Sequence, residues 1–422
     1  MNIDILVERF GKKELVGTID TLPGIGEGFT YSRQWLDAPD PKPLSLSLPL
    51  GEGRFDARRT RPYFDGLLPE GNPRAAYARA FRVSTGAYVK ILANLAWECI
   101  GAVEVRGESE RPAARYDRFD SEELARAVSE TQSVSIWTDD QTRLSLAGAQ
   151  PKLGLYRAAD GSWRKPVGGA PSTHILKPAH ARFASTVVNE TICTKAASEL
   201  GLRTPAVEVL DLDTSVICIE RFDRSFDEEC SMLDGLAVPR RLHQEDFCQA
   251  LGIVPEQKYE SGGEGHLNRM MQLIRGYSAR PIDDLQQLWS AVVFDFVIGN
   301  FDAHLKNFAL MRDASWNTLR FAPLYDLVST ACYESLSTEL PFAIGGKRRS
   351  DDIDARHFAA EARSLLLPEG WAMLRVEEIS RLAPAAVERA GSDLESAGVA
   401  SAAEVASSIA ASMQGRIARL LG

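Results

Sequence analysis

The chain has 422 residues, of which 45% are hydrophobic and 25% are charged, and its formal net charge is −10 at pH 7. This length exceeds one compact core, so two or three subdomains are expected. The negative net charge argues against a chain-wide nucleic-acid-binding surface. The six cysteines form no C-x-x-C pair, the N-terminus lacks the apolar core of a signal peptide, and no apolar run approaches a membrane helix. The sequence therefore predicts a cytoplasmic protein.

The N-terminal part, residues 1–115, is predicted to be a β-rich subdomain without catalytic chemistry. Residues 3–9 and 14–19 have the composition of two strands joined by a hairpin. Residues 43–50 alternate leucine and serine, which is typical of a half-buried strand. Residues 63–81 favour two short helices separated by a turn. These elements indicate a structural or partner-binding part of the chain.

The polar, proline-containing residues 108–120 indicate a linker and a domain boundary. A second domain over residues 116–225 is predicted to contain strands and small-residue loops. The remaining residues, 226–422, have mainly helical spacing of their apolar side chains, so this part is predicted to be a mostly α-helical lobe.

A loop of small residues, Ser145 to Lys152, is a candidate for phosphate binding. Small side chains let backbone N–H groups approach an anion, as in the loop that covers the ATP phosphates in kinases. The candidate contacts in this loop are Ala147, Gly148, Ala149, Gln150 and Lys152. The alternative is a plain β-hairpin. Lys177 ends the predicted strand that follows, from which an ammonium group could reach the α- and β-phosphates.

Another predicted strand, residues 214–220, is followed by the run Arg221 to Arg224. In a kinase this position is the hinge, where backbone groups hold adenine and an acid holds the ribose. Asp223 is the candidate acid. The alternative is that Asp223 pairs with Arg221 or Arg224.

The strongest chemical signal lies in residues 284–308, an apolar helix that runs into a short polar loop. In this loop Asp302 and Asn307 have the D-x-x-x-x-N spacing of a phosphoryl-transfer loop, in which the Asp accepts the nucleophile's proton and the Asn binds Mg²⁺. Nineteen residues later an apolar run ends in Asp326, which is placed to be a second Mg²⁺ ligand. For an isolated loop, turn hydrogen bonds are the simpler interpretation, but the two motifs in this order favour phosphoryl transfer.

His304 lies between the two loop residues. We count it with the nucleotide-binding residues and not with the metal ligands, because no second His or Cys stands nearby. The alternative is a structural hydrogen bond to the loop backbone.

With these residues in view, the sequence resembles the HipA family, the serine/threonine protein kinase toxins of bacterial toxin–antitoxin modules. The resemblance covers most of the chain and includes LSLSLPL (44–50), FDGLLPEG (64–71), SLAGAQPK (145–152), THILKP (173–178), ERFDR (220–224), HQEDFCQALG (243–252), KYES (258–261), NFDAHLKNF (300–308) and PLYDLVS (323–329). It implies an α/β, two-lobed protein-kinase-like fold with a β-rich N-terminal subdomain and a mainly α-helical C-terminal lobe.

The resemblance also implies roles for individual residues. Asp302 is similar to the catalytic base of the family, Asn307 and Asp326 to its Mg²⁺ ligands, and Lys177 to its nucleotide-phosphate lysine. The residues similar to the adenine and ribose contacts are Glu220, Phe222 and Asp223. Ser145 is similar to the serine that these kinases autophosphorylate, which switches them off. Pro151 stands where the best-known members carry an acid.

The cofactors implied are ATP and Mg²⁺, and the implied partner is a HipB-type helix-turn-helix antitoxin through which operator DNA is bound. The implied substrate is an aminoacyl-tRNA synthetase, typically glutamyl-tRNA synthetase. Two rivals are a kinase with a lipid or small-molecule acceptor and a non-catalytic corepressor that assists an antitoxin on DNA. The first lacks any membrane-binding signal, and the second leaves the full set of phosphoryl-transfer residues unexplained.

Overall fold

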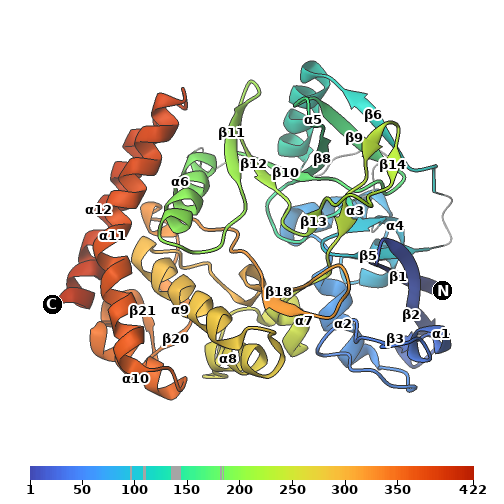
Figure 1. Cartoon of the computed structure of the whole chain (residues 1–422), viewed down its shortest axis with the longest axis horizontal. Helices are drawn as coiled ribbons and strands as arrows, with labels where there is room; N and C mark the ends of the chain where they lie inside the picture. Colours follow the sequence, from blue (N-terminus) through green and yellow to red (C-terminus); the bar gives the residue numbers. More distant parts are fainter. Residues whose placement is uncertain (96, 108–110, 135–143, 181–182, 184) are drawn as a thin grey trace. The chain divides into compact units, whose positions relative to one another are not determined.

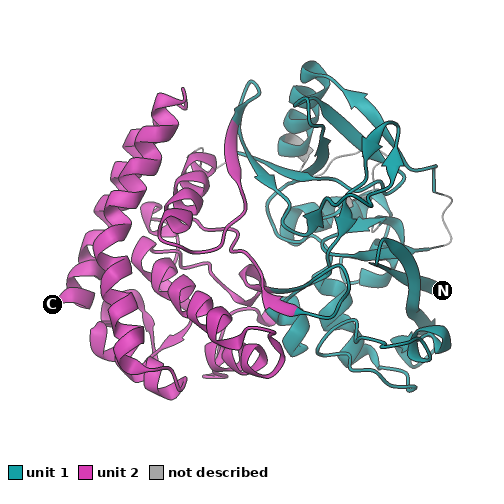
Figure 2. Ribbon diagram, in the orientation of Figure 1, with its two compact units in different colours: residues 1–181, 210–255, 310–318 teal, residues 182–209, 256–309, 319–422 magenta. Residues whose placement is uncertain are grey.

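The computed structural model describes residues 1–422 except 96, 108–110, 135–143, 181–182 and 184. The chain divides into two compact units, each assembled from separate stretches of sequence (Figure 2). Unit 1 contains residues 1–181, 210–255 and 310–318, and unit 2 contains residues 182–209, 256–309 and 319–422. The three consecutive domains expected from the sequence, residues 1–115, 116–225 and 226–422, stay a prediction.

The first sheet of unit 1 has the strand order β3-β2-β1-β5. It consists of β1 (Asn2–Arg9), β2 (Lys12–Leu22), β3 (Gly26–Tyr31) and β5 (Val103–Arg106). The predicted hairpin is confirmed, because β1 and β2 pair antiparallel across Gly11, whose φ of +69° suits glycine. Its buried core includes Ile5, Phe29 and Trp35 and also Trp316, which comes from far along the chain.

Helices cover this core and join it to the next part of unit 1 (Figure 1). They are α1 (Arg33–Leu36), α2 (Ala57–Gly66), α3 (Gly71–Ala80) and α4 (Tyr88–Leu95). The two helices predicted within residues 63–81 are confirmed as α2 and α3. The strand predicted over residues 43–50 is wrong: this segment is a turn with a single Ser45–Leu48 bridge. The hydroxyls of Ser45 and Ser47 donate to Glu245 and to the Gln249 carbonyl, which holds the segment as a loop.

A second sheet has the order β11-β12-β10-β8-β9-β6, and all of its strands belong to unit 1 except for the first three residues of β11. Its strands are β6 (Arg115–Phe119), β8 (Leu153–Arg157), β9 (Trp163–Val167), β10 (His174–Pro178), β11 (Val207–Asp211) and β12 (Ser215–Glu220). Helix α5 (Ser121–Val134) packs its Leu124 and Val128 against Leu155 and Leu176 of this sheet. Of the linker predicted over residues 108–120, residues 115–119 instead form β6, which pairs with β9 over its whole length, whereas residues 111–114 have no regular secondary structure.

Shorter elements complete unit 1. They are β4 (Glu98–Cys99) with β7 (Leu144–Ser145), β13 (Arg224–Ser225) with β16 (Arg240–Arg241), β14 (Met232–Leu233) with β15 (Leu236–Ala237), β17 (Gln244–Asp246), α7 (Phe247–Leu251) and β18 (Ala309–Arg312), which ends in this unit. The β4–β7 pair is parallel and places Ser145 opposite Cys99. Since β7 and β8 do not pair with each other, the plain hairpin is not the structure of the loop between them.

Unit 2 is mainly helical, and its residues 256–309 and 319–422 fall within the part, residues 226–422, that is predicted to be mostly α-helical. Its helices are α6 (Thr186–Glu199), α8 (His266–Tyr277), α9 (Pro281–Ile298), α10 (Ala355–Ser364), α11 (Glu369–Ser396) and α12 (Ala402–Leu421). Its strands are β19 (Leu319–Phe321), β20 (Glu339–Ile344) and β21 (Lys347–Arg349). Helix α9 packs against α8, α11 and α12, and its apolar side chains from Leu285 onward are buried. Among the described residues, no helix is both long and apolar enough to cross a membrane.

Candidate active site

The loop that follows α9 presents one carboxylate to solvent and buries its neighbours. Helix α9 ends at Gly299, whose φ of +71° is the left-handed conformation of a helix C-cap. Asp302 is exposed, whereas residues 303–307 are buried. The backbone closes on itself, because the His304 N–H donates to the Asp302 carbonyl (2.8 Å) and the Asn307 N–H donates to the His304 carbonyl (2.8 Å). The loop is therefore held rigidly behind the one exposed acid.

Asn307 is oriented by the same loop. Its Nδ2 donates to the Asp302 carbonyl (3.1 Å), so the amide oxygen Oδ1 is the atom that can face a cation. Asp326 lies on a neighbouring segment, which Tyr325 fixes by donating its hydroxyl to the Lys306 carbonyl (2.7 Å). Within unit 2 the structure thus brings together the two segments predicted to supply Asp302, Asn307 and Asp326. An amide oxygen and a carboxylate are ligands that Mg²⁺ accepts.

Asp326 has a strained backbone. Its φ is +55°, a conformation that a non-glycine residue rarely adopts. Such strain costs on the order of 1–3 kcal/mol and gathers at functional sites. The hydrogen bond from Asn300 Nδ2 to the Asp326 carbonyl (3.3 Å) helps to hold the strained peptide.

Asn300 and Asp295 are site residues that the sequence interpretation missed. Asn300 Nδ2 donates to Asp295 Oδ1 (2.9 Å) as well as to the Asp326 carbonyl, and its Oδ1 accepts the Asp302 N–H (3.4 Å). One buried amide therefore joins the end of α9, the loop and the Asp326 segment. The available signal was a polar residue directly after the glycine that ends an apolar helix.

The buried carboxyl of Asp295 predicts a pH effect on stability. Burial raises the pKa of Asp295 from 3.8 to about 7, against the lowering effect of the Asn300 hydrogen bond. Between these two pKa values the unfolded chain has released this proton and the folded chain keeps it, so the unfolding free energy falls as pH rises toward 7. Asp295→Asn removes this pH-dependent contribution to the unfolding free energy, because the amide is neutral. The amide oxygen can still accept the hydrogen bond from Asn300.

We expect Asp295→Asn to be as stable as the parent protein near pH 4 and more stable by roughly 2–4 kcal/mol above pH 7. Urea unfolding at a series of pH values measures both proteins. Parallel pH profiles for the two proteins would contradict the assignment.

A further contact that the sequence did not indicate involves Tyr259, in the KYES segment. Its hydroxyl donates to Asp302 Oδ1. The ring packs edge-on against His304, with 5.1 Å between ring centroids and an interplanar angle of 80°. His304 thus supports the loop through its backbone and an aromatic contact.

In unit 1 the small-residue loop packs inward. The hydroxyl of Ser145, which is fully buried, donates to the Leu67 carbonyl (2.6 Å), and the Glu70 N–H donates to the Gly148 carbonyl (3.0 Å). Gly148 has a φ of +109°, and a Cβ there would lie 2.7 Å from Lys152 Nζ. The positive φ, rather than the flexible lysine side chain, is what favours glycine at this position.

The same loop is tied to the strand that carries Lys177. Gln150 Nε2 donates to the Pro178 carbonyl (2.9 Å), and Lys152 Nζ donates to the Gln150 carbonyl (3.1 Å). Ala149 is exposed and Ala147 is half-buried. Lys177 is buried in β10, where it pairs with Ile217 of β12. The predicted phosphate loop and lysine are therefore neighbours in one unit.

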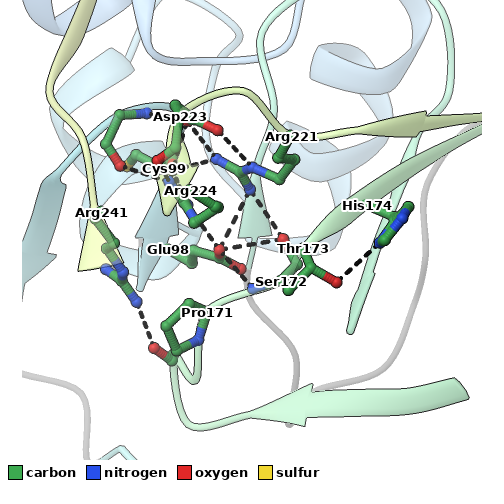
Figure 3. Close-up of polar contacts among 12 residues, drawn as sticks. Glu98, Cys99, Pro171, Ser172, Thr173, His174, Arg221, Asp223, Arg224 and Arg241 are labelled. Carbon is green, nitrogen blue, oxygen red and sulfur yellow. Dashed lines mark hydrogen bonds and ion pairs between the residues drawn. The ribbon is translucent and has the colours of Figure 1, made fainter. Parts of the chain in front are cut away.

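The segment after β12 contains a buried charge network (Figure 3). Asp223 accepts two hydrogen bonds from Arg221 (2.8 and 2.9 Å) and one from the Gly101 N–H (2.6 Å), and it pairs with Arg224 (3.1 Å). Burial raises the pKa of Asp223, but the two guanidinium groups outweigh it and hold that pKa below its usual range. The alternative in which Asp223 pairs with its arginine neighbours is confirmed.

Because both carboxylate oxygens of Asp223 are already bonded, this geometry does not present Asp223 as a ribose ligand. Glu220, at the end of β12, is exposed, and Phe222 is half-buried. These two residues remain the candidates at the predicted hinge.

The other carboxylate of the network is Glu98 of β4. Its Oε1 accepts hydrogen bonds from Arg221 (3.2 Å), Arg224 (2.8 Å) and the N–H of Ser172 (2.8 Å). Burial raises the pKa of Glu98, yet the arginines lower it further than burial raises it. Since β4 pairs with β7, the network also anchors the strand that carries Ser145.

Known protein families and individual proteins are similar to this chain. The model of the HipA-like C-terminal domain matches residues 144–387, and the model of the HipA N-terminal domain matches residues 10–106. Y4mE of Sinorhizobium fredii is 38% identical over 347 residues, covering 79% of this chain and 80% of that protein. The serine/threonine-protein kinase toxin HipA of Shewanella oneidensis is 28% identical over 373 residues, covering 85% of this chain and 82% of that protein.

Among solved structures, the complex of HipA, HipB and operator DNA from Shewanella oneidensis MR-1 contains a chain that matches with a TM-score of 0.78 at 24% identity. The match covers 99% of this chain and 97% of that one. The fold is thus a mixed α/β, protein-kinase-like fold, as predicted. Because the family models span more than half of its length, the chain belongs to the HipA family.

Proposed function

We propose that this protein is a serine/threonine protein kinase toxin that transfers the γ-phosphate of ATP to a protein hydroxyl. The observation that carries the proposal is the arrangement in unit 2, where one exposed carboxylate, Asp302, stands on a loop tied by Asn300 to the segment of Asp326. The HipA relative named as a serine/threonine kinase toxin supports the choice of acceptor.

Asp302 orients the acceptor hydroxyl and accepts its proton. The hydroxyl oxygen forms a bond to the γ-phosphorus, the bond from this phosphorus to the β,γ-bridging oxygen breaks, and ADP leaves with that electron pair. Because the surrounding loop is buried and hydrogen-bonded, the carboxylate keeps its position throughout. Positioning of this kind is the main contribution a protein makes to phosphoryl transfer.

Asn307 and Asp326 hold Mg²⁺, which neutralises charge on the ATP phosphates when it is bound. The oxygen-only donor set fits this ion. Among the described residues, no group of three or more His, Cys, Asp or Glu side chains is placed to hold a metal, so a site built by the protein alone is not expected there.

Residues of unit 1 bind the nucleotide. Lys177 contacts the phosphates, and the loop from Ala147 to Lys152 covers them with backbone N–H groups. Glu220 and Phe222 contact the adenosine. His304 is counted with the nucleotide-binding residues, and its ring also packs against Tyr259 beside the catalytic loop.

Ser145 is the inactivating autophosphorylation site. In the inward-packed loop its hydroxyl is buried, so the loop has to leave Leu67 before the serine can be phosphorylated. A phosphate adds up to about two negative charges to the serine. The phosphorylated side chain therefore cannot return to that buried position without a large desolvation cost. Phosphorylation would therefore keep the loop out and the kinase inactive.

The biological role proposed is that of a toxin that arrests growth by inhibiting translation, with an aminoacyl-tRNA synthetase such as glutamyl-tRNA synthetase as the target. A HipB-like antitoxin is the proposed partner, supported by the HipA–HipB–operator DNA complex of the structural relative. Operator DNA would be bound mainly through the antitoxin, in keeping with the net charge of −10 on this chain.

The test is intact-mass spectrometry after incubation with Mg-ATP. We expect a gain of one phosphate that peptide mapping assigns to Ser145. Asp302→Gln is the control for catalysis and Ser145→Ala the control for the site, and neither should gain that phosphate.

If the parent protein gains no phosphate and ATP does not raise its melting temperature, the corepressor alternative replaces the kinase proposal. If ATP raises the melting temperature without phosphorylation, only the role of Ser145 is withdrawn.

A further inference from the structure

Tyr259 makes a contact with Asp302 that the phosphoryl-transfer chemistry does not require. Its hydroxyl donates to Asp302 Oδ1, although 41% of the residue is exposed to solvent. The ring lies against His304, and the ammonium group of Lys258 lies 5.6 Å from the ring centroid. Tyr259 and Asp302 both belong to unit 2.

The backbone on both sides of Tyr259 is held by hydrogen bonds, so displacement of the phenol from Asp302 requires only a rotation of the side chain. On one side the Leu305 N–H donates to the Lys258 carbonyl (3.4 Å). On the other, the Glu260 N–H donates to the Pro341 carbonyl (2.8 Å), and the Glu260 carbonyl accepts from Arg348 (2.6 Å). A rotation of the exposed phenol away from Asp302 would leave these anchors intact.

The bond that Tyr259 makes is the bond an acceptor has to make. A serine or threonine acceptor must donate its hydroxyl hydrogen to the catalytic carboxylate from hydrogen-bond distance. The phenol O–H of Tyr259 is a donor of the same kind and already donates to Asp302. While it stays there, an incoming hydroxyl competes for the same carboxylate.

We propose that Tyr259 occupies the acceptor position at Asp302 and so selects protein acceptors over water. A protein substrate contributes binding energy from contacts beyond its hydroxyl and can displace the phenol, whereas a water molecule contributes only its own hydrogen bonds. The phenol thereby suppresses ATP hydrolysis in the absence of a protein acceptor. This inference rests on the proposed role of Asp302 as catalytic base.

The experiment measures steady-state ATP hydrolysis with Mg-ATP and no protein acceptor. Tyr259→Phe removes only the hydroxyl, and a charge-assisted hydrogen bond of this type predicts that the hydrolysis rate rises on the order of tenfold. The KM for ATP should stay unchanged. Tyr277→Phe is the matched control, since Tyr277 is an exposed tyrosine of the same unit, 57% exposed, and its variant should hydrolyse ATP at the parent rate.

An unchanged rate would overturn the inference. A reduced rate would overturn it as well, because it would mean that Tyr259 orients Asp302 for catalysis. Adding Asp302→Asn to Tyr259→Phe separates the two proposals. If the accelerated hydrolysis survives in that double variant, Asp302 is not the base and the proposed function fails.

A second measurement needs no activity. In protein labelled with 3-fluorotyrosine, the ¹⁹F resonance of Tyr259, assigned through Tyr259→Phe, should shift in Asp302→Ala, while that of Tyr277 stays in place. A Tyr259 resonance that does not respond to Asp302→Ala would show that the contact is absent, whatever the catalytic result.

Discussion

Asp302→Asn is expected to lose phosphoryl transfer by roughly 10²–10⁴-fold, the usual contribution of a positioned general base. The amide has nearly the same shape as the carboxylate, but it cannot accept the acceptor's proton. ATP binding should be nearly unchanged, because the predicted nucleotide contacts are Lys177, the loop from Ala147 to Lys152, Glu220 and Phe222. Single-turnover transfer measured by mass spectrometry and ATP-dependent thermal stabilisation report the two properties separately.

The matched control for this variant is Asp351→Asn. The carboxylate of Asp351 is 71% exposed, belongs to the same unit and forms one ion pair with Arg419, so its loss should leave transfer unchanged. Parent-like turnover in Asp302→Asn would remove Asp302 from the mechanism. Loss of both transfer and ATP stabilisation would instead indicate a disturbed loop.

Glu98→Ala is expected to destabilise unit 1 by about 3–5 kcal/mol, the cost of removing one partner from a buried ion pair. Glu98 is 3% exposed and accepts hydrogen bonds from Arg221, Arg224 and both donors of Ser172. Without it, two buried guanidinium groups share Asp223 as their remaining carboxylate in the network of Figure 3. Urea unfolding followed by circular dichroism measures the loss.

Glu52→Ala is the control for a surface ion pair. Glu52 bonds to Arg33 at 2.6 Å, but its side chain is 76% exposed, so its removal should leave the unfolding free energy nearly unchanged. Equal losses in Glu98→Ala and Glu52→Ala would mean that burial does not strengthen the network.

Local sequence signals predicted the elements whose formation depends on near neighbours. The β1–β2 hairpin follows from two apolar runs around Gly11, and helix α9 follows from the spacing of its apolar side chains. The segment 43–50 was mispredicted as a strand because its leucine–serine alternation has a local strand pattern. Its serines bond to Glu245 and Gln249, about 200 residues away, and no local pattern reveals that partner.

In the candidate site too, features set by the local sequence could be predicted and features set by tertiary contacts could not. The spacing and order of Asp302, Asn307 and Asp326 are properties of the sequence, so they could be predicted. The roles of Asn300 and Tyr259 are not, because each depends on which group the fold places against it. Asp223 shows the converse, since its position predicted a ligand and its buried arginine partners show a structural ion pair.

The core beneath the first sheet has a consequence for how the chain is made. Trp316 is fully buried there and packs against Trp35 with 6.0 Å between the ring centroids. Its indole N–H donates to the Glu8 carbonyl (3.2 Å). The core under the first strands is therefore completed only by a tryptophan that is synthesised some 300 residues later. Contacts between residues so far apart in sequence form slowly. A nascent chain that ends before Trp316 therefore lacks part of the buried core of unit 1.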